Sequence, residues 1–254
     1  MEKRISIFAG IILVMIPVLT VGLTFGRIFI FGQRAADDAR EAFSRQSTNG
    51  YNVLLADKEG TAIMVCLLEG DSTHLVSILP SSCPRGEKNT TFLAVYQKEG
   101  IVGLKEKVSQ SLSCTLSGSL EVDFAGLGAV VDALDGIEMN GKTYSGQALK
   151  TYLHSLPMDS AGAQAQQDVV LAVGRRFCSA GFWKGQNGLG KLLRIADTDF
   201  SVTALMKIGK KLIPALSGTG LYRYCLPEQG NWEISGKNKT FAEIIALAEK
   251  RRMA

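Results

Sequence analysis

The first strong pattern along the chain is a long run without charged residues near its start. Ile5–Gly26 holds only uncharged and mostly apolar residues, with Lys3 and Arg4 before it and Arg27 after it. As a helix rising 1.5 Å per residue, the run reaches about 33 Å, enough to cross the hydrocarbon core of a bilayer. We therefore expect residues 1–31 to form a cytoplasmic N-terminus and one transmembrane anchor.

The alternative is a cleaved signal peptide, whose hydrophobic region is normally about 7 to 15 residues long and ends at a small-x-small site. Here the run is longer and continues through Arg27 into the apolar residues 28–31, which favours a retained anchor. The positive charges before the run place the N-terminus in the cytoplasm, although Arg27 and Arg34 weaken that bias. The expected location is the cell membrane, with one span and an extracytoplasmic C-terminal domain.

Beyond a polar spacer over residues 32–50, the pattern changes to one mixed domain over residues 51–254. Apolar runs of strand length predict strands over Tyr51–Asp57, Ala62–Leu68, His74–Leu79, Ser119–Asp123 and Leu221–Leu226, the second and third forming a hairpin. Apolar residues at helical spacing predict helices over Val102–Leu112, Phe124–Leu134, Ser145–Leu153, Gln164–Ser179, Val202–Lys211 and Thr240–Arg252. This mixed order favours an α/β domain in which helices cover a sheet.

The charge is concentrated at the predicted membrane flank. The whole chain carries +4, and residues 1–34 hold four basic residues against one acidic residue, so +4 less +3 leaves +1 for the rest. A nearly neutral outer domain offers no basic surface for nucleic acid, and no nucleic-acid partner is expected. The hydrophobic share of 46% is that of a folded globular chain.

The five cysteines are widely spaced and contain no C-x-x-C pair, which gives no support to a zinc knuckle or a thioredoxin-like site. No metal site is assigned on this basis. Cys66 lies inside an apolar run and is expected to be a core residue.

The order of segments resembles the LytR-CpsA-Psr family of envelope proteins from about Tyr51 to Glu233. Ser117–Asn140 (SGSLEVDFAGLGAVVDALDGIEMN) is similar to the family's strand end, helix and D-A-L-G-G stretch. Gly141–Tyr152 (GKTYSGQALKTY) looks like its L-x-G-x-Q-A-L-x-Y segment, and Ala165–Val169 (AQQDV) lies where its R-Q-Q helix begins. The hairpin is similar as well, with SILPSS in place of S-I-P-R-D.

This resemblance implies a three-layer α/β/α domain with a central mixed sheet and a hydrophobic pocket for a polyprenyl chain. It also implies transfer of glycopolymers from a polyprenyl-pyrophosphate carrier to peptidoglycan, with magnesium if the protein is catalytically active. No other cofactor is evident. The family's lipid cavity corresponds here to an apolar stripe that is otherwise read as ordinary core, made of Val122, Phe124, Leu127, Val131 and Leu134.

The residues that would carry this chemistry are mostly replaced. Phosphoryl transfer depends on cations that offset the charge of the pyrophosphate, and the loss of a whole set of arginines removes that clamp. The replacements are Gly60–Ala62 at the early aspartate motif, Pro80 and Ser81 at the end of the hairpin, His154 and Leu156 at an arginine pair, and Ala163 and Gln166 beside the glutamine pair.

Several polar residues are candidates for the mouth of a pocket, each with a simpler structural alternative. Asp57 is one residue out of step with the family's first-strand aspartate and is equally a turn carboxylate. Arg85 and Lys88 are candidate cations or solvated loop residues, and His154 is a candidate base or an ordinary residue at a helix end. The full set is Asp57, Arg85, Lys88, His154, Gln166 and Gln167, and none is assigned as catalytic.

Three hypotheses follow. The favoured one is a non-catalytic relative that binds a polyprenyl phosphate or pyrophosphate lipid in cell-wall glycopolymer assembly. The alternatives are an active glycopolymer transferase and an unrelated anchored sensor or adhesion domain. The expected partners are the membrane, through the N-terminal helix, and a polyprenyl-phosphate lipid or cell-wall glycopolymer.

Overall fold

The computed structural model describes residues 50–69, 72–218, 220–227, 233–234 and 239–240, which divide into two compact units. Among the described residues, the sheet unit comprises residues 50–124, Ser155–Asp168 and those from Ala196 onward, and the helical unit comprises Ala125–His154 and Val169–Ile195. The predicted anchor, most of the polar spacer and the body of the predicted C-terminal helix lie outside the described residues. Among the helices that are described, none is both long and apolar enough to span a bilayer.

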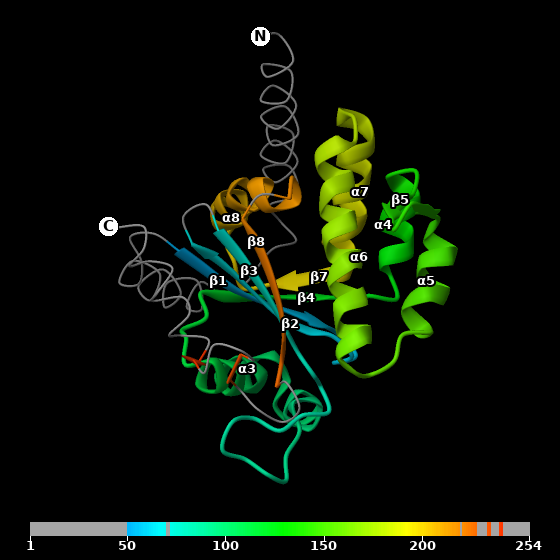
Figure 1. The fold of residues 1–254 in the computed structure, drawn as a ribbon. Coiled ribbons are helices and arrows are strands. Elements are labelled where there is room, and N and C mark those ends of the chain that lie inside the picture. The colour runs from blue at the N-terminus through cyan, green and yellow to red at the C-terminus, as the bar shows by residue number, and fades with distance from the viewer. Residues whose placement is uncertain (1–49, 70–71, 219, 228–232, 235–238, 241–254) are drawn as a thin grey trace. The chain divides into compact units, whose positions relative to one another are not determined.

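The sheet unit is built on a mixed sheet with the strand order β7-β4-β1-β2-β3-β8 (Figure 1). Consecutive strands β1, β2 and β3 pair antiparallel, β4 and β8 join them in parallel, and β7 is antiparallel to β4. The strands are β1 Gly50–Asp57, β2 Ile63–Glu69, β3 Ser72–Ile78, β4 Gly118–Val122, β7 Ala196–Thr198 and β8 Leu221–Leu226. The five predicted strands and the predicted hairpin are therefore confirmed.

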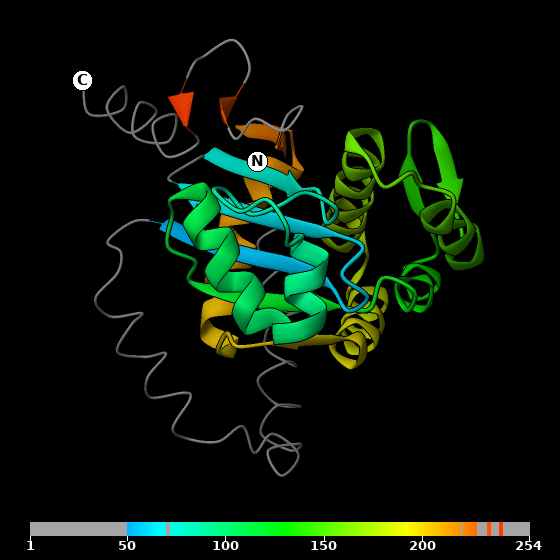
Figure 2. The same ribbon diagram turned by 90° about the horizontal axis from the view of Figure 1, so that it is seen from below.

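One face of this sheet packs against helix α3 (Phe92–Leu112). Alternate strand residues such as Leu54, Val65 and Val76 point to this side and form the main core together with Phe92 and Leu104 of the helix. Figure 2 shows α3 lying across that face.

Helix α3 starts ten residues earlier than the predicted Val102–Leu112. The Thr91 side chain accepts a hydrogen bond from the amide of Ala94 at 3.1 Å and caps the first turn. The glycine break falls inside the element as a kink, because Gly100 adopts a φ of 65° that glycine tolerates.

The opposite face of the sheet carries helix α8 (Val202–Leu216) and the first part of α6 (Ser160–Ser179). Val53 and Leu68 of the sheet pack against Ile208 of α8 in a second apolar cluster. Helices therefore cover both sides of a central mixed sheet, as the three-layer expectation requires (Figures 1 and 2). Two short strands, β9 Glu233–Ile234 and β10 Lys239–Thr240, pair separately, and β10 contains the residue predicted to cap the C-terminal helix.

The helical unit contains α4 (Leu127–Ala133), α5 (Gly146–His154), α7 (Phe182–Ile195) and the hairpin of β5 (Ile137–Met139) and β6 (Lys142–Tyr144). Helices α4 and α5 approach closely at two glycines, since a Cβ on Gly146 would lie 2.1 Å from the carbonyl oxygen of Gly128. The carboxylate of Asp132 accepts from the amide of Gly146 at 2.7 Å and fixes the start of α5.

Two helices of this unit differ from the prediction. Helix α4 begins at Leu127 rather than Phe124, because residues 124–126 form a turn in which the Phe124 amide donates to Asp57. Helix α7 was not predicted, since its glycines weaken the helical pattern. One of them is needed for packing: a Cβ on Gly188 would meet the side chain of Leu134 at 2.8 Å.

Candidate functional site

Asp57 ends strand β1 as a buried carboxylate that is 2% exposed. One oxygen accepts from the amide of Phe124 at 3.0 Å, and the other accepts from the hydroxyl of Thr61 at 2.5 Å. The turn that brings Thr61 back is closed by the Gly60 amide, which donates to the Asp57 carbonyl at 2.8 Å. Gly60 has a φ of 73°, a conformation that favours glycine. Both carboxylate oxygens thus accept hydrogen bonds from groups of the protein itself.

Gln166 reaches the same turn from helix α6. Its side-chain amide donates to the carbonyl of Thr61 at 3.3 Å, so Thr61 contacts both Asp57 and Gln166. Two of the six predicted polar residues are therefore brought together by one turn. The contact is made by an uncharged side chain at a position where the resembled family has an arginine.

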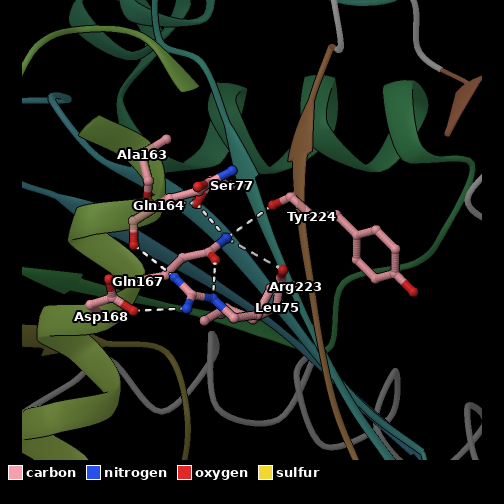
Figure 3. Close-up of polar contacts among 8 residues, drawn as sticks. All are labelled: Leu75, Ser77, Ala163, Gln164, Gln167, Asp168, Arg223 and Tyr224. Carbon is pink, nitrogen blue, oxygen red and sulfur yellow. Dashed lines mark hydrogen bonds and ion pairs between the residues drawn. The ribbon is translucent and has the colours of Figure 1, made fainter. Parts of the chain in front are cut away.

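Gln167 is the centre of a buried polar network (Figure 3). Its side chain is fully buried, and its amide nitrogen donates to the Ser77 hydroxyl at 2.8 Å and the Tyr224 carbonyl at 2.9 Å, with the Leu75 carbonyl at 3.4 Å. Its amide oxygen accepts from the Arg223 guanidinium at 2.8 Å. A buried amide with partners on both ends locks α6 to strands β3 and β8.

Arg223 of strand β8 directs all three guanidinium nitrogens at helix α6 (Figure 3). Beside its bond to Gln167, it donates to the carboxylate of Asp168 at 2.7 Å and to the main-chain carbonyl of Gln164 at 2.8 Å. Arg223 is not among the residues predicted from the sequence. The signal was present in the Leu221–Leu226 strand, where Arg223 lies between two tyrosines and so faces the opposite side of the sheet.

The two loop cations stand apart from this network. Arg85 and Lys88 are exposed on the loop between β3 and α3, and no hydrogen bond or ion pair of the described residues joins either side chain to Asp57 or Gln166. The main-chain amide of Arg85 donates to Ser111 at 3.0 Å, which anchors the loop but leaves the side chain in solvent. Their role at a pocket mouth stays a prediction.

The remaining candidates are divided between the two units. His154 is the exposed last residue of α5 in the helical unit. The apolar stripe is buried throughout, with Val122 and Phe124 in the sheet unit and Leu127, Val131 and Leu134 in the helical unit. Burial suits both a core and a lipid pocket, so the pocket assignment stays a prediction.

The helical unit contains a polar cavity of about 420 Å³ that none of the stripe residues lines. Helix α6 contributes Arg175 and Arg176, and the hairpin segment contributes Glu138 and Asn140. Arg176 donates to the carbonyl of Leu134 at 2.8 Å, which fixes its guanidinium against α4. The lining carries both signs of charge and does not resemble an apolar tunnel.

The described residues do not fit the magnesium ion that the family resemblance implies for an active enzyme. Magnesium is held by carboxylate oxygens, and both oxygens of Asp57 face protein donors. Across the ranges that the structure describes, no three His, Cys, Asp or Glu side chains gather in a metal-binding group.

No protein-family model matches the chain, and no curated protein matches its sequence. Solved structures do match. A protein from Streptococcus agalactiae aligns with a TM-score of 0.60 at 13% identity, over 83% of this chain and 88% of its own. B. subtilis TagV aligns with a TM-score of 0.57 at 16% identity, over 72% and 86%.

A third structure, TagT bound to LIIa-WTA, aligns with a TM-score of 0.54 at 16% identity, over 70% of this chain and 78% of its own. Sequence identities this low show similarity of fold only. TagT, TagV and the further neighbour TagU are LytR-CpsA-Psr proteins. The chain therefore has the fold of the LytR-CpsA-Psr proteins, as the order of its sequence segments predicted.

Proposed function

We propose that the protein is a membrane-anchored, non-catalytic relative of the LytR-CpsA-Psr enzymes that binds a polyprenyl-phosphate-linked glycopolymer precursor without transferring it. The observation that carries the proposal is that Asp57, the carboxylate expected at the site, is buried with both oxygens accepting hydrogen bonds from the protein itself. The fold supports an envelope function of this class, and the solved complex of TagT with LIIa-WTA supports the kind of ligand.

The hydrogen-bond donors and acceptors at the sheet support the absence of glycopolymer transfer. A pyrophosphate needs guanidinium or ammonium donors, and a metal needs carboxylate oxygens with free lone pairs. Both oxygens of Asp57 accept hydrogen bonds, from Phe124 and Thr61, and all three guanidinium nitrogens of Arg223 donate to helix α6. A metal or a substrate phosphate at either group would therefore have to share or displace these protein contacts.

The apolar stripe supports binding of the prenyl chain. A prenyl chain binds by burial of apolar surface, a non-directional interaction that needs no charged residue. The stripe keeps large apolar side chains at the positions that the family resemblance assigns to the lipid cavity. Loss of chemistry is therefore compatible with retention of lipid.

Two measurements on the full chain in detergent test the proposal. Native mass spectrometry with a polyprenyl-pyrophosphate-linked saccharide is expected to show a one-to-one complex, whereas the water-soluble saccharide phosphate without the prenyl chain is expected to show none. Incubation of the same complex with magnesium and peptidoglycan is expected to give no transfer beside an active relative. Absence of the lipid complex would refute the binding, and turnover comparable to that of the relative would establish the transferase alternative.

A variant pair sharpens the argument about donors. Thr61→Ala frees one oxygen of Asp57, whereas Thr151→Ala removes an exposed hydroxyl that bonds only within helix α5. If occupation of Asp57 is what keeps metal away, Thr61→Ala is expected to raise the affinity for magnesium in isothermal titration, while Thr151→Ala leaves it unchanged. Equal affinities in the two variants would show that Asp57 is not the limiting group.

A further inference from the structure

One wall of the polar cavity in the helical unit is a single face of helix α6. Ala172, Arg175, Arg176 and Ser179 line the cavity, and their spacing of i, i+3, i+4 and i+7 is that of one helix face. The Nε of Arg176 donates to the carbonyl of Leu134 at 2.8 Å, which fixes that guanidinium at the wall. This wall therefore carries two positive charges on a regular helix.

Another wall comes from the hairpin of β5 and β6. Glu138 and Thr143 are cross-strand partners, so their side chains lie on the same face of the hairpin, while both neighbours of Glu138 in β5 are buried. Asn140 and Gly141 form the two-residue turn, with φ values of 50° and 73° that suit an Asn-Gly pair. The hairpin therefore brings one carboxylate, one hydroxyl and one amide to the cavity.

The two carboxylates that line the cavity differ in their partners. Asp135 forms an ion pair with Lys184 of α7. The carboxylate of Glu138 forms no hydrogen bond or ion pair with any other residue that the structure describes. All the lining residues belong to the helical unit, so this arrangement lies within one compact body. The cavity therefore has the Glu138 charge on its hairpin side and two guanidiniums on its α6 side.

We propose that this cavity binds a small zwitterion, a molecule with one carboxylate and one ammonium group, as in an amino acid or a short peptide. The guanidiniums of Arg175 and Arg176 hold the carboxylate, and the carboxylate of Glu138 accepts from the ammonium group. The volume of about 420 Å³ lies within the range of small-molecule sites. This site goes beyond the proposed function, since it contains no residue of the apolar stripe and needs no lipid.

Other classes of ligand match this lining less well. A simple anion places a like charge near Glu138, a simple cation does the same near the two arginines, and a neutral saccharide offers no opposite charge to either wall. Within the described lining, only Ala172 has an apolar side chain, so an apolar ligand would bury little apolar surface there. A zwitterion is the class that supplies an opposite charge to both walls at once.

Ligand-observed NMR of the full chain in a nonionic detergent tests the site with probes of similar size. Alanine carries both charges, N-acetylalanine lacks the ammonium group, and alaninamide lacks the carboxylate. Alanine is expected to bind saturably and at least about tenfold more tightly than either analogue, because each analogue leaves one charged wall without a partner. An analogue that binds as tightly as alanine would overturn the proposal. Alanyl-alanine, whose charges lie further apart, distinguishes a peptide from a free amino acid, and saturable binding of neither zwitterion would also overturn it.

Variants that remove one charge from each wall supply a second readout. Glu138→Gln should abolish the preference for alanine over N-acetylalanine, whereas Arg175→Gln should reduce the preference over alaninamide several-fold. Both side chains are exposed, so urea unfolding should show little change in stability. Arg194→Gln is the control and should keep both preferences, because Arg194 is an exposed arginine of α7 in the same unit and does not line the cavity. Unchanged preferences in both wall variants would place the zwitterion elsewhere and overturn the site.

Discussion

The two faces of the central sheet are stabilised by different kinds of interaction. The α3 face is held mainly by apolar packing, with Leu54, Val65 and Val76 in one core with Phe92. The other face has a smaller apolar cluster under α8 and, under α6, a network centred on the buried side chain of Gln167. One face is stabilised by area removed from water, and the other also requires each buried polar group to find its partner.

This difference decides what substitution does on each face. On the apolar face, a substitution lowers stability in proportion to the volume that it removes, because apolar contacts have no preferred direction. A buried amide with four partners has no equivalent replacement, since every alternative leaves a donor or an acceptor unpaired. The polar face is therefore the one where a small chemical change has a consequence out of proportion to its size.

The largest expected effect is on the apolar face. Phe92→Ala removes a fully buried ring at the start of α3 and should lower the free energy of unfolding by about 3 to 5 kcal/mol. Urea unfolding of the full chain in detergent measures the change. Val102→Ala is the control on the same helix, because its side chain is 76% exposed, and it should change stability by less than about 0.5 kcal/mol. Similar losses in the two variants would mean that α3 is not held by this core.

The same contrast explains what the sequence could predict. Strands β1, β2 and β3 follow from apolar runs separated by turn residues, and the core residues Leu104 and Val108 of α3 follow from helical spacing. Phe92 lies outside the predicted helix. Helix α7 could not be predicted in this way, since Gly188 is there for its close approach to Leu134 and weakens the local helical pattern. Tertiary packing overrode propensity at that position.

The candidate site was less predictable than the fold. Asp57 and Gln166 were identified by their alignment with a family motif, but their shared partner Thr61 is visible only once the turn is formed. The role of Arg223 depends on the parallel pairing of β8 with β3, a contact between residues far apart in the sequence. Periodicity reports which face a residue occupies and says nothing of which helix lies above it.

A smaller effect is expected on the polar face. There, two variants distinguish the contribution of a side chain from that of a main-chain carbonyl. Gln167→Leu keeps the approximate volume but removes the hydrogen bonds that Gln167 makes with Ser77 and Arg223, and it should cost about 2 to 3 kcal/mol. Gln164→Leu is the matched control, because Gln164 is exposed and contributes only its main-chain carbonyl to Arg223. Its cost should stay below about 0.5 kcal/mol in the same urea experiment. A Gln167→Leu protein as stable as this control would show that the network adds nothing to the packing of α6.

The smallest effect appears only at alkaline pH and concerns the α8 side of the sheet. Burial raises the pKa of the Cys66 thiol to about 12, whereas an unfolded cysteine ionises near pH 8.5. Because the folded value is the higher one, the stability contribution is complete below about pH 8.5 and is lost as the pH rises toward 12. Between pH 8 and pH 10 the native chain should therefore lose about 1.9 kcal/mol more than Cys66→Ala, measured by urea unfolding at both pH values. Parallel losses in the two proteins would mean that the thiol reaches solvent, and that this face of the sheet is less closed at Cys66 than its packing against the α8 cluster indicates.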